Sequence, residues 1–152
     1  MPTRLKESLS AEEVIQRAPL LERIVRDFTD CYERRKKNRE FLDEISIIAK
    51  KFNSPEIDET RYRLQRDVAE LSRELESYER EIRALGGVLK DRERGLIYFY
   101  SIREDRKIYL VWDHHNPQIV SWHELGETYS DRMPVETPQD TAAAALDSPD
   151  RE

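Results

Sequence analysis

The sequence of 152 residues is poor in several residue types on which common sites depend. Its single cysteine, Cys31, excludes an internal disulfide and a cysteine-rich zinc module, and it fits a reducing compartment. Its four glycines cannot build a glycine-rich phosphate loop. No apolar run approaches the ~18 residues that a membrane span needs, and the first residues lack the apolar segment of a secretory signal. We therefore expect a cytoplasmic protein without a membrane-spanning segment.

Charged residues are abundant, but neither sign dominates. Asp, Glu, Lys and Arg make up 38% of the chain, and the formal net charge is −6. This charge argues against general nucleic-acid binding, because the phosphate backbone attracts basic surfaces. Residues 133–152 contain five acidic side chains and one basic one, so they hold −4 of the total. We expect 133–152 to be a disordered acidic tail after a nearly neutral ordered part with a thin core.

The first 85 residues contain no glycine and have the pattern of helices. A capping box at 10–13 predicts a helix start. Pro19 is costly inside a helix, so we expect a short leading helix before it and a long helix from Pro19 to about Phe52. A second helix is expected from Asp58 to Leu85. The short break between the helices predicts a long antiparallel hairpin over 10–87, preceded by an N-terminal arm, 1–9.

Apolar residues in both expected helices recur every three or four residues, as in the seam of a coiled coil. The seam of the second helix is unbroken. In the first helix, Arg35 and Asn38 interrupt the seam. Polar residues at such positions fix the register or the partner number of a coiled coil, and a local bend of the helix is the alternative. Because two helices with narrow seams bury little apolar surface, we expect this hairpin to associate with a partner.

From residue 88 onward, the apolar period changes to two. Segments 95–102, 107–113 and 118–125 are rich in β-branched and aromatic residues and are separated by turn-like sequences. They predict a three-stranded antiparallel meander within a small sheet, 88–132, that packs on the hairpin. The expected fold class is therefore α+β: a coiled-coil-like antiparallel helical hairpin followed by a β meander.

The register of the three strands decides which side chains share a face. We expect Ile102 to pair with Lys107, and Asp113 to pair with Gln118. A slip of one residue would exchange the two faces of a strand. In the expected register, His123 lies opposite Ile108, and one face carries aromatic residues that include Tyr98, Tyr109 and Trp122.

All three histidines lie in the β-rich part beside carboxylates, and they suggest a ligand site. Imidazole and carboxylate groups are suited to Zn, Ni or Mn and to proton transfer. The spacing matches no known zinc signature, so we predict no cofactor and keep a divalent metal as the alternative. The segment before the first strand contributes to such a site only if it folds back over the sheet. The candidate ligand set is His123, Asp91, Glu93, Glu124 and Arg132, and the secondary set is Asp113, His114 and His115.

Five short motifs follow the expected hairpin in a fixed order. They lie at 87–91, 93–96, 109–112, 122–125 and 132–134. Together with the hairpin, they resemble a prokaryotic domain family of unknown function over about residues 10–135. The resemblance implies a charged helical hairpin followed by strands, but no agreed activity or cofactor. The chain departs from the family pattern after Leu96, after Trp112 and before Arg132, so a site shared by the family would be altered here.

Two functional hypotheses follow from these patterns. The first is a non-enzymatic interaction or structural module that forms a homodimer, either through helix pairing involving Arg35 and Asn38 or through the face with Tyr98, Tyr109 and Trp122. An unidentified protein is the other partner that such surfaces would fit. The second is a small-ligand, metal-binding or catalytic domain centred on His123. We favour the first hypothesis, because the thin core buries little apolar surface without a partner and the sequence contains no catalytic motif.

Overall fold

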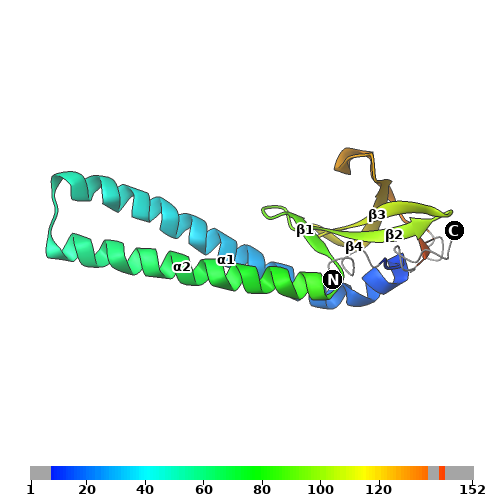
Figure 1. The fold of residues 1–152 in the computed structure, drawn as a ribbon, viewed down its shortest axis with the longest axis horizontal. Coiled ribbons are helices and arrows are strands. Elements are labelled where there is room, and N and C mark those ends of the chain that lie inside the picture. Colours follow the sequence, from blue (N-terminus) through cyan, green and yellow to red (C-terminus); the bar gives the residue numbers. More distant parts are fainter. Residues whose placement is uncertain (1–7, 137–140, 143–152) are drawn as a thin grey trace, which may run out of the picture.

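The structure is a computed structural model that describes residues 8–136, 141 and 142. It contains a long helical hairpin with an antiparallel sheet packed against one end (Figure 1). The α+β class, the hairpin and the antiparallel sheet are therefore confirmed. Residues 1–7, 137–140 and 143–152 of the expected arm and tail lie outside the described residues. Within the expected tail, Met133–Pro134 and Thr141–Ala142 form strands β5 and β6, so order extends further than we expected.

Helix α1 spans Ala11–Lys51 and helix α2 spans Pro55–Ala84. The expected capping box is present: the Ser10 side chain accepts a hydrogen bond from the Glu13 backbone N–H (3.2 Å), and the Glu13 carboxylate accepts one from the Ser10 N–H (2.9 Å). The start of α2 differs from the prediction, because Ser54 caps it and Pro55 occupies its first turn.

Pro19 does not divide α1, so the expected short leading helix is wrong. A proline in a helix removes one backbone hydrogen bond and costs about 3 kcal/mol. Val14 and Leu21, which flank the proline, are both fully buried in the core of the protein. Their burial on both sides of Pro19 stabilises the continuous helix enough to offset this local cost.

Polar side chains cross the seam between the two helices where the sequence predicted an interruption. The Arg35 guanidinium donates a hydrogen bond to Ser72 Oγ (3.0 Å), and Asn38 lies half-buried one turn further on. One turn closer to the sheet, Cys31 is buried and its Sγ lies 3.5 Å from the Leu71 carbonyl oxygen. Burial and the charge of Glu74 raise the pKa of the Cys31 thiol, as is typical of a packed rather than a reactive cysteine.

The sheet has more strands than the predicted meander. Strands β1 (Val88–Asp91), β2 (Leu96–Arg103), β3 (Arg106–Asp113), β4 (Asn116–Glu124) and β5 follow one another in space, and β6 pairs with β2. The three expected strands are β2, β3 and β4. The additional strands are short edge segments of two to four residues. Segments this short carry too little apolar alternation to be recognised in a sequence.

The register of β2 with β3 is the predicted one, with Ile102 opposite Lys107. The predicted register of β3 with β4 is wrong: Asp113 pairs with Asn116 and Trp112 with Val120, with an irregularity between the two pairs. This irregularity shifts most of β4 by one position, and a shift of one residue exchanges the faces of a strand. Trp122 therefore lies on the core-facing side, opposite Leu110.

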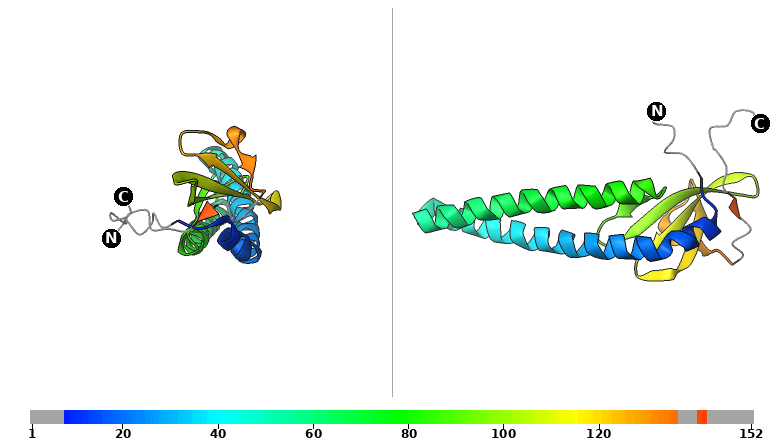
Figure 2. Two further views of the ribbon diagram at one scale, coloured as in Figure 1. Left: turned by 90° about the vertical axis from the view of Figure 1, so that its right-hand side faces the viewer. Right: turned by 90° about the horizontal axis from the view of Figure 1, so that it is seen from below.

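The core lies between one face of the sheet and the hairpin end that it covers (Figure 2). From this face of the sheet, Ile97, Phe99, Leu110 and Trp112 are buried against residues of α1 and against Ile82 of α2. The rest of the hairpin extends beyond the sheet in one direction. Neither helix of the described chain is long and apolar enough to cross a membrane.

Candidate functional site

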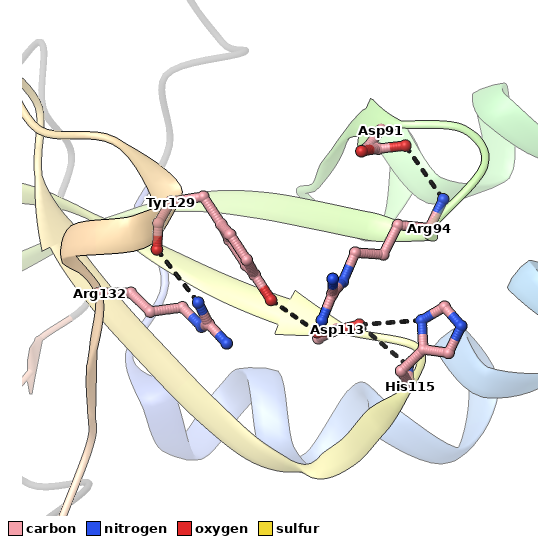
Figure 3. A network of polar contacts seen from close by, with 6 residues as sticks. All are labelled: Asp91, Arg94, Asp113, His115, Tyr129 and Arg132. Atoms are coloured by element: carbon pink, nitrogen blue, oxygen red, sulfur yellow. Dashed lines mark hydrogen bonds and ion pairs between the residues drawn. The ribbon is translucent and has the colours of Figure 1, made fainter.

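The sheet face that points away from the core carries two of the candidate polar residues, His123 and Asp113. Because the β4 register is shifted, His123 pairs with Tyr109 on this outer face. At one end of the same face, the β1–β2 turn, the β3–β4 turn and the segment around the short helix η2 (Tyr129–Asp131) come together (Figure 3). Their side chains meet at Asp113, the last residue of β3.

Asp113 is the centre of a hydrogen-bond network. Its Oδ2 accepts hydrogen bonds from Arg94 Nε (3.2 Å), Arg94 Nη2 (3.0 Å) and the Tyr129 hydroxyl (2.8 Å). Its Oδ1 accepts the backbone N–H of His115 (2.9 Å). The side chain of Asp113 is only 7% exposed. Both carboxylate oxygens are thus engaged, and we refer to Asp113, Arg94, Tyr129 and His115 as the Asp113 clamp.

The electrostatics of the Asp113 clamp favour fixed protonation states. Burial by itself would raise the pKa of Asp113, but the hydrogen bonds from Arg94, the His115 backbone and Tyr129 outweigh it and lower the pKa below its usual value. Burial and the hydrogen bond to Asp113 raise the pKa of Tyr129. At neutral pH the carboxylate is therefore ionised and the phenol neutral. Such a group joins three loops, but it does not exchange protons readily.

Two arginines contact the ring of Tyr129 and hold the η2 segment over the sheet. The Arg132 guanidinium carbon lies 3.7 Å from the ring centroid, and that of Arg94 lies 5.2 Å from it. Arg132 also donates a hydrogen bond to the Tyr129 carbonyl oxygen (3.2 Å). Arg132 therefore has a local role in the ordering of this segment.

His123 is buried, with both ring nitrogens bonded. Its Nδ1 lies 2.8 Å from the Glu124 carbonyl oxygen, which can only accept, so Nδ1 carries a proton. Its Nε2 lies 3.0 Å from the Tyr98 hydroxyl oxygen, and in the neutral ring Nε2 accepts a hydrogen bond from this hydroxyl. The rings of Tyr98 and Tyr109 lie 5.3 and 5.6 Å from the imidazole, centroid to centroid. Burial raises the pKa of Tyr98, and the positive charge of Arg132 opposes this rise. His123 is thus a hydrogen-bonded sheet histidine.

We expect Tyr98→Phe to lower the free energy of unfolding by about 1 to 3 kcal/mol, because it leaves the buried His123 Nε2 without a hydrogen-bond donor. Urea denaturation at pH 7.5 measures this loss. Tyr62→Phe is the matched control, since Tyr62 is highly exposed on α2 and should change stability by less than about 0.5 kcal/mol. Equal effects of the two substitutions would contradict the assigned hydrogen bond.

The other predicted ligands have partners away from His123. Asp91 caps the β1–β2 turn and accepts the backbone N–H groups of Glu93 and Arg94. Glu93 lines a shallow depression beside α1, and Glu124 forms an ion pair with Arg106 (2.7 Å). Within residues 8–136, 141 and 142, no group of three or more His, Cys, Asp or Glu side chains is arranged to hold a metal ion. The metal alternative therefore gains no support from the geometry of this region.

The two remaining histidines belong to the β3–β4 turn. His115 is exposed, and its Nδ1 lies 3.7 Å from Asp113 Oδ1. His114 packs against Gly95, whose φ of +79° is unusual for a residue with a side chain. A Cβ atom at Gly95 would lie 2.8 Å from the Cβ of His114 and 2.9 Å from Val25 Cγ1. Burial, and secondarily the charge of His115, lower the pKa of His114. His114 therefore contributes to packing in the turn, whereas His115 contributes its backbone N–H to Asp113.

The sequence-based prediction missed Tyr129 and the central role of Asp113. Asp113 is the last residue of the buried end of β3, and Tyr129 is an isolated aromatic residue in a polar segment. Both features are weak signals, because their meaning depends on a contact between segments that are distant in the sequence. One signal could have pointed to the contact between Asp113 and Tyr129. A carboxylate at the end of a buried strand is itself buried, and a buried carboxylate requires a hydrogen-bond donor.

Comparison with known proteins adds a family without an assigned activity. The sequence model of a family described as "Uncharacterized conserved protein (DUF2203)" matches residues 9–135. This span includes both helices, strands β1 to β5 and the Asp113 clamp. Neither a curated protein nor a solved structure matches the chain.

Proposed function

The chain belongs to this uncharacterised conserved family, and we propose that it is a non-enzymatic interaction module that forms homodimers through the far part of its hairpin. We call this part the distal hairpin and define it as residues 32–52, which include the end of α1 and its C-cap Phe52, and residues 55–70 of α2. The single buried Cys31 fits a cytoplasmic location for such a module.

One observation carries this proposal: the distal hairpin exposes large apolar side chains in one line. Between Cys31 and Ala49, α1 buries no residue. Phe41, Ile48 and Phe52 are 49%, 45% and 71% exposed, and Ile45 between them is half-buried. Residues 41, 45, 48 and 52 follow one another at spacings of four, three and four, so they lie along one side of the helix. We call these four residues the apolar stripe.

The apolar stripe is accessible because it points away from the sheet. Phe41 follows Val14 by 27 residues, and Ile48 follows Leu21 by 27 residues. At ~3.6 residues per turn, this separation is about seven and a half turns, which places the later residue on the opposite side of a straight helix. Val14 and Leu21 belong to the core under the sheet. The sheet therefore does not obstruct a partner at the stripe.

A second hairpin is the partner that suits this surface best. Two helices alone bury only narrow seams, whereas a four-helix bundle encloses the apolar sides of all its helices. Most oligomers of soluble proteins are symmetric pairs of one chain, which bury the same patch on both copies. Fully burying a large apolar side chain contributes about 1.5 to 3 kcal/mol, so a few such residues on each copy supply a substantial driving force.

The aromatic surface that the sequence suggested is a weaker candidate for association. Tyr98 and Tyr109 are half-buried on the outer face of the sheet, where their rings pack against His123. Trp122 lies on the core-facing side, with the Arg103 guanidinium 4.3 Å from the centroid of its ring. These three residues do not share one face, so we assign dimer formation to the distal hairpin.

Sedimentation velocity or light scattering of the full chain tests the proposal. At tens of micromolar we expect a dimer, and we expect Ile48→Glu to weaken the dimer at least ~100-fold, because it places a charge in an apolar contact. Ile119→Glu is the matched control. Ile119 is similarly exposed but lies on β4, so this change should leave the dimer intact.

Two results would contradict the proposed function. One is a wild-type chain that stays strictly monomeric at about 100 µM, because a dissociation constant well above this value would correspond to a contact of less than about 5.5 kcal/mol. The other is a dimer that Ile48→Glu and Ile119→Glu affect equally. Circular dichroism of each variant shows whether it is folded, so a loss of association is not confused with unfolding.

A further inference from the structure

We infer that the two hairpins of the dimer lie antiparallel, with their distal hairpins overlapping around a two-fold axis near Ile45 and their sheets at opposite ends. This inference rests on the proposed homodimer and specifies its geometry. The apolar stripe of one copy thus packs against the apolar stripe of a second copy that runs in the opposite direction.

On the same side of α1, the stripe continues toward the sheet as a basic segment. Arg34 and Lys37 precede Phe41 by seven and four residues, so they lie on the same side of α1 as the stripe. Both side chains are exposed. They belong to a run of five cations in residues 34–39, and no ion pair found within the described residues involves this run. One side of α1 is therefore apolar near the tip and basic nearer the sheet.

This division disfavours a parallel dimer. When two stripes meet in the same direction, Phe41 faces its copy, but Arg34 and Lys37 also face their own copies. Like charges at close positions on packed helices are destabilising, and a whole run of them repels along its length. A parallel dimer would therefore concentrate the basic runs of both chains at one level.

An antiparallel dimer keeps the apolar contact and separates the basic runs. Around an axis at Ile45, Phe41 of one copy lies within one residue of the level of Ile48 of the other copy, and Ile45 lies level with its own copy, so the two stripes overlap. Glu40 of α1 lies level with Lys50 of the other copy, and this pair occurs twice because of the symmetry. The basic runs move to the two outer ends of the overlap.

At each outer end, the basic run meets the acidic start of α2 of the other copy. Helix α1 ends at Lys51 and α2 begins at Pro55, so these two ends lie side by side at the tip of the hairpin. At this tip, Glu56 lies level with Lys51, and therefore level with residue 39 of an antiparallel partner. Asp58 follows Glu56 in the first turn of α2, and Glu59 comes directly after it. The antiparallel arrangement thus places opposite charges together at both ends of the contact.

Site-specific cross-linking distinguishes the two directions. In a Cys31→Ala background, we expect Glu44→Cys, next to the axis, to cross-link to its own copy with a short bis-maleimide. Lys37→Cys should not cross-link to itself, but a mixture of Lys37→Cys and Lys51→Cys should cross-link, because 37 and 51 lie eight and six residues to either side of residue 45 on the same helix. A parallel dimer gives the opposite result: Lys37→Cys cross-links to itself and the 37–51 pair does not.

Small-angle X-ray scattering of the unmodified chain gives an independent measurement if the cysteine variants do not fold. An antiparallel overlap makes the dimer clearly longer than the monomer, because the sheets lie at opposite ends, whereas a parallel dimer keeps nearly the monomer length. A dimer with the parallel cross-links or the parallel length overturns the antiparallel geometry but leaves the proposed function in place. A monomer at all concentrations overturns both.

Discussion

Replacing Trp112 with alanine is expected to lower the free energy of unfolding by about 3 to 5 kcal/mol, the usual cost of removing a buried aromatic side chain. Trp112 is fully buried in β3 at the centre of the core-facing side of the sheet. It pairs with Ile97 of β2 on one side and Val120 of β4 on the other. Its removal would leave a cavity under the sheet where the hairpin packs. Urea denaturation followed by circular dichroism measures the loss.

Trp112→Phe is the informative companion to this experiment. The indole Nε1 of Trp112 is buried and has no hydrogen-bond partner among the described residues. Phenylalanine removes this donor together with part of the ring, so no hydrogen bond is lost, and we expect a cost below about 1.5 kcal/mol. A phenylalanine variant as unstable as the alanine variant would contradict this interpretation and would indicate that the indole N–H is satisfied in solution.

Asp113→Asn is expected to destabilise the protein by about 2 to 3 kcal/mol at pH 7, because it weakens several hydrogen bonds to one charged acceptor. The Asp113 clamp joins the β1–β2 turn, the β3–β4 turn and the η2 segment, so its loss should release all three. His115→Ala is the matched control. It keeps the backbone N–H that binds Asp113 and removes only an exposed ring, and it should change stability by less than about 0.5 kcal/mol.

The direction of the Asp113 pKa shift also predicts how the stability difference between the wild type and Asp113→Asn changes with pH. The folded state lowers the pKa of Asp113. Its stabilising contribution is therefore complete above the unfolded-state pKa of about 3.9 and is lost as the pH falls below that value through the folded pKa. The difference in stability between the wild type and Asp113→Asn should be largest near neutral pH and shrink in acid. A difference that is constant from neutral pH to about pH 3 would contradict an ionised, hydrogen-bonded Asp113.

The candidate ligands around His123 do not form one site in the structure. His123, Asp91 and Glu93 belong to residue types suited to a ligand site, and their chemistry alone suggested that they meet. The shifted register of β4 turns His123 toward Tyr98, while the turn at Asp91 uses its carboxylate for its own backbone N–H groups. Whether a carboxylate serves a ligand or a turn depends on contacts that no spacing in the sequence reveals.

The parts of the fold that the sequence determined are those specified by neighbouring residues. Ser10 and Glu13 define the start of α1 because both partners of a capping box lie within one turn. The hairpin follows from two apolar seams joined by a short break, and the register of β2 with β3 follows from a tight turn. The incomplete burial of the hairpin was also visible in the sequence, since its seams are narrow and interrupted by Arg35.

Only the tertiary structure decided the remaining features, because they depend on energies shared between distant segments. Pro19 is retained in a continuous helix because the residues around it are buried against the sheet. The irregularity at Trp112 and Asp113 shifts β4 so that Trp122 faces the core and His123 the outer face. Asp113 is stabilised as an anion by Arg94 and Tyr129, which lie 19 residues before it and 16 residues after it. Local conformational preferences of about 1 to 3 kcal/mol are overridden where the burial of large apolar side chains contributes more free energy.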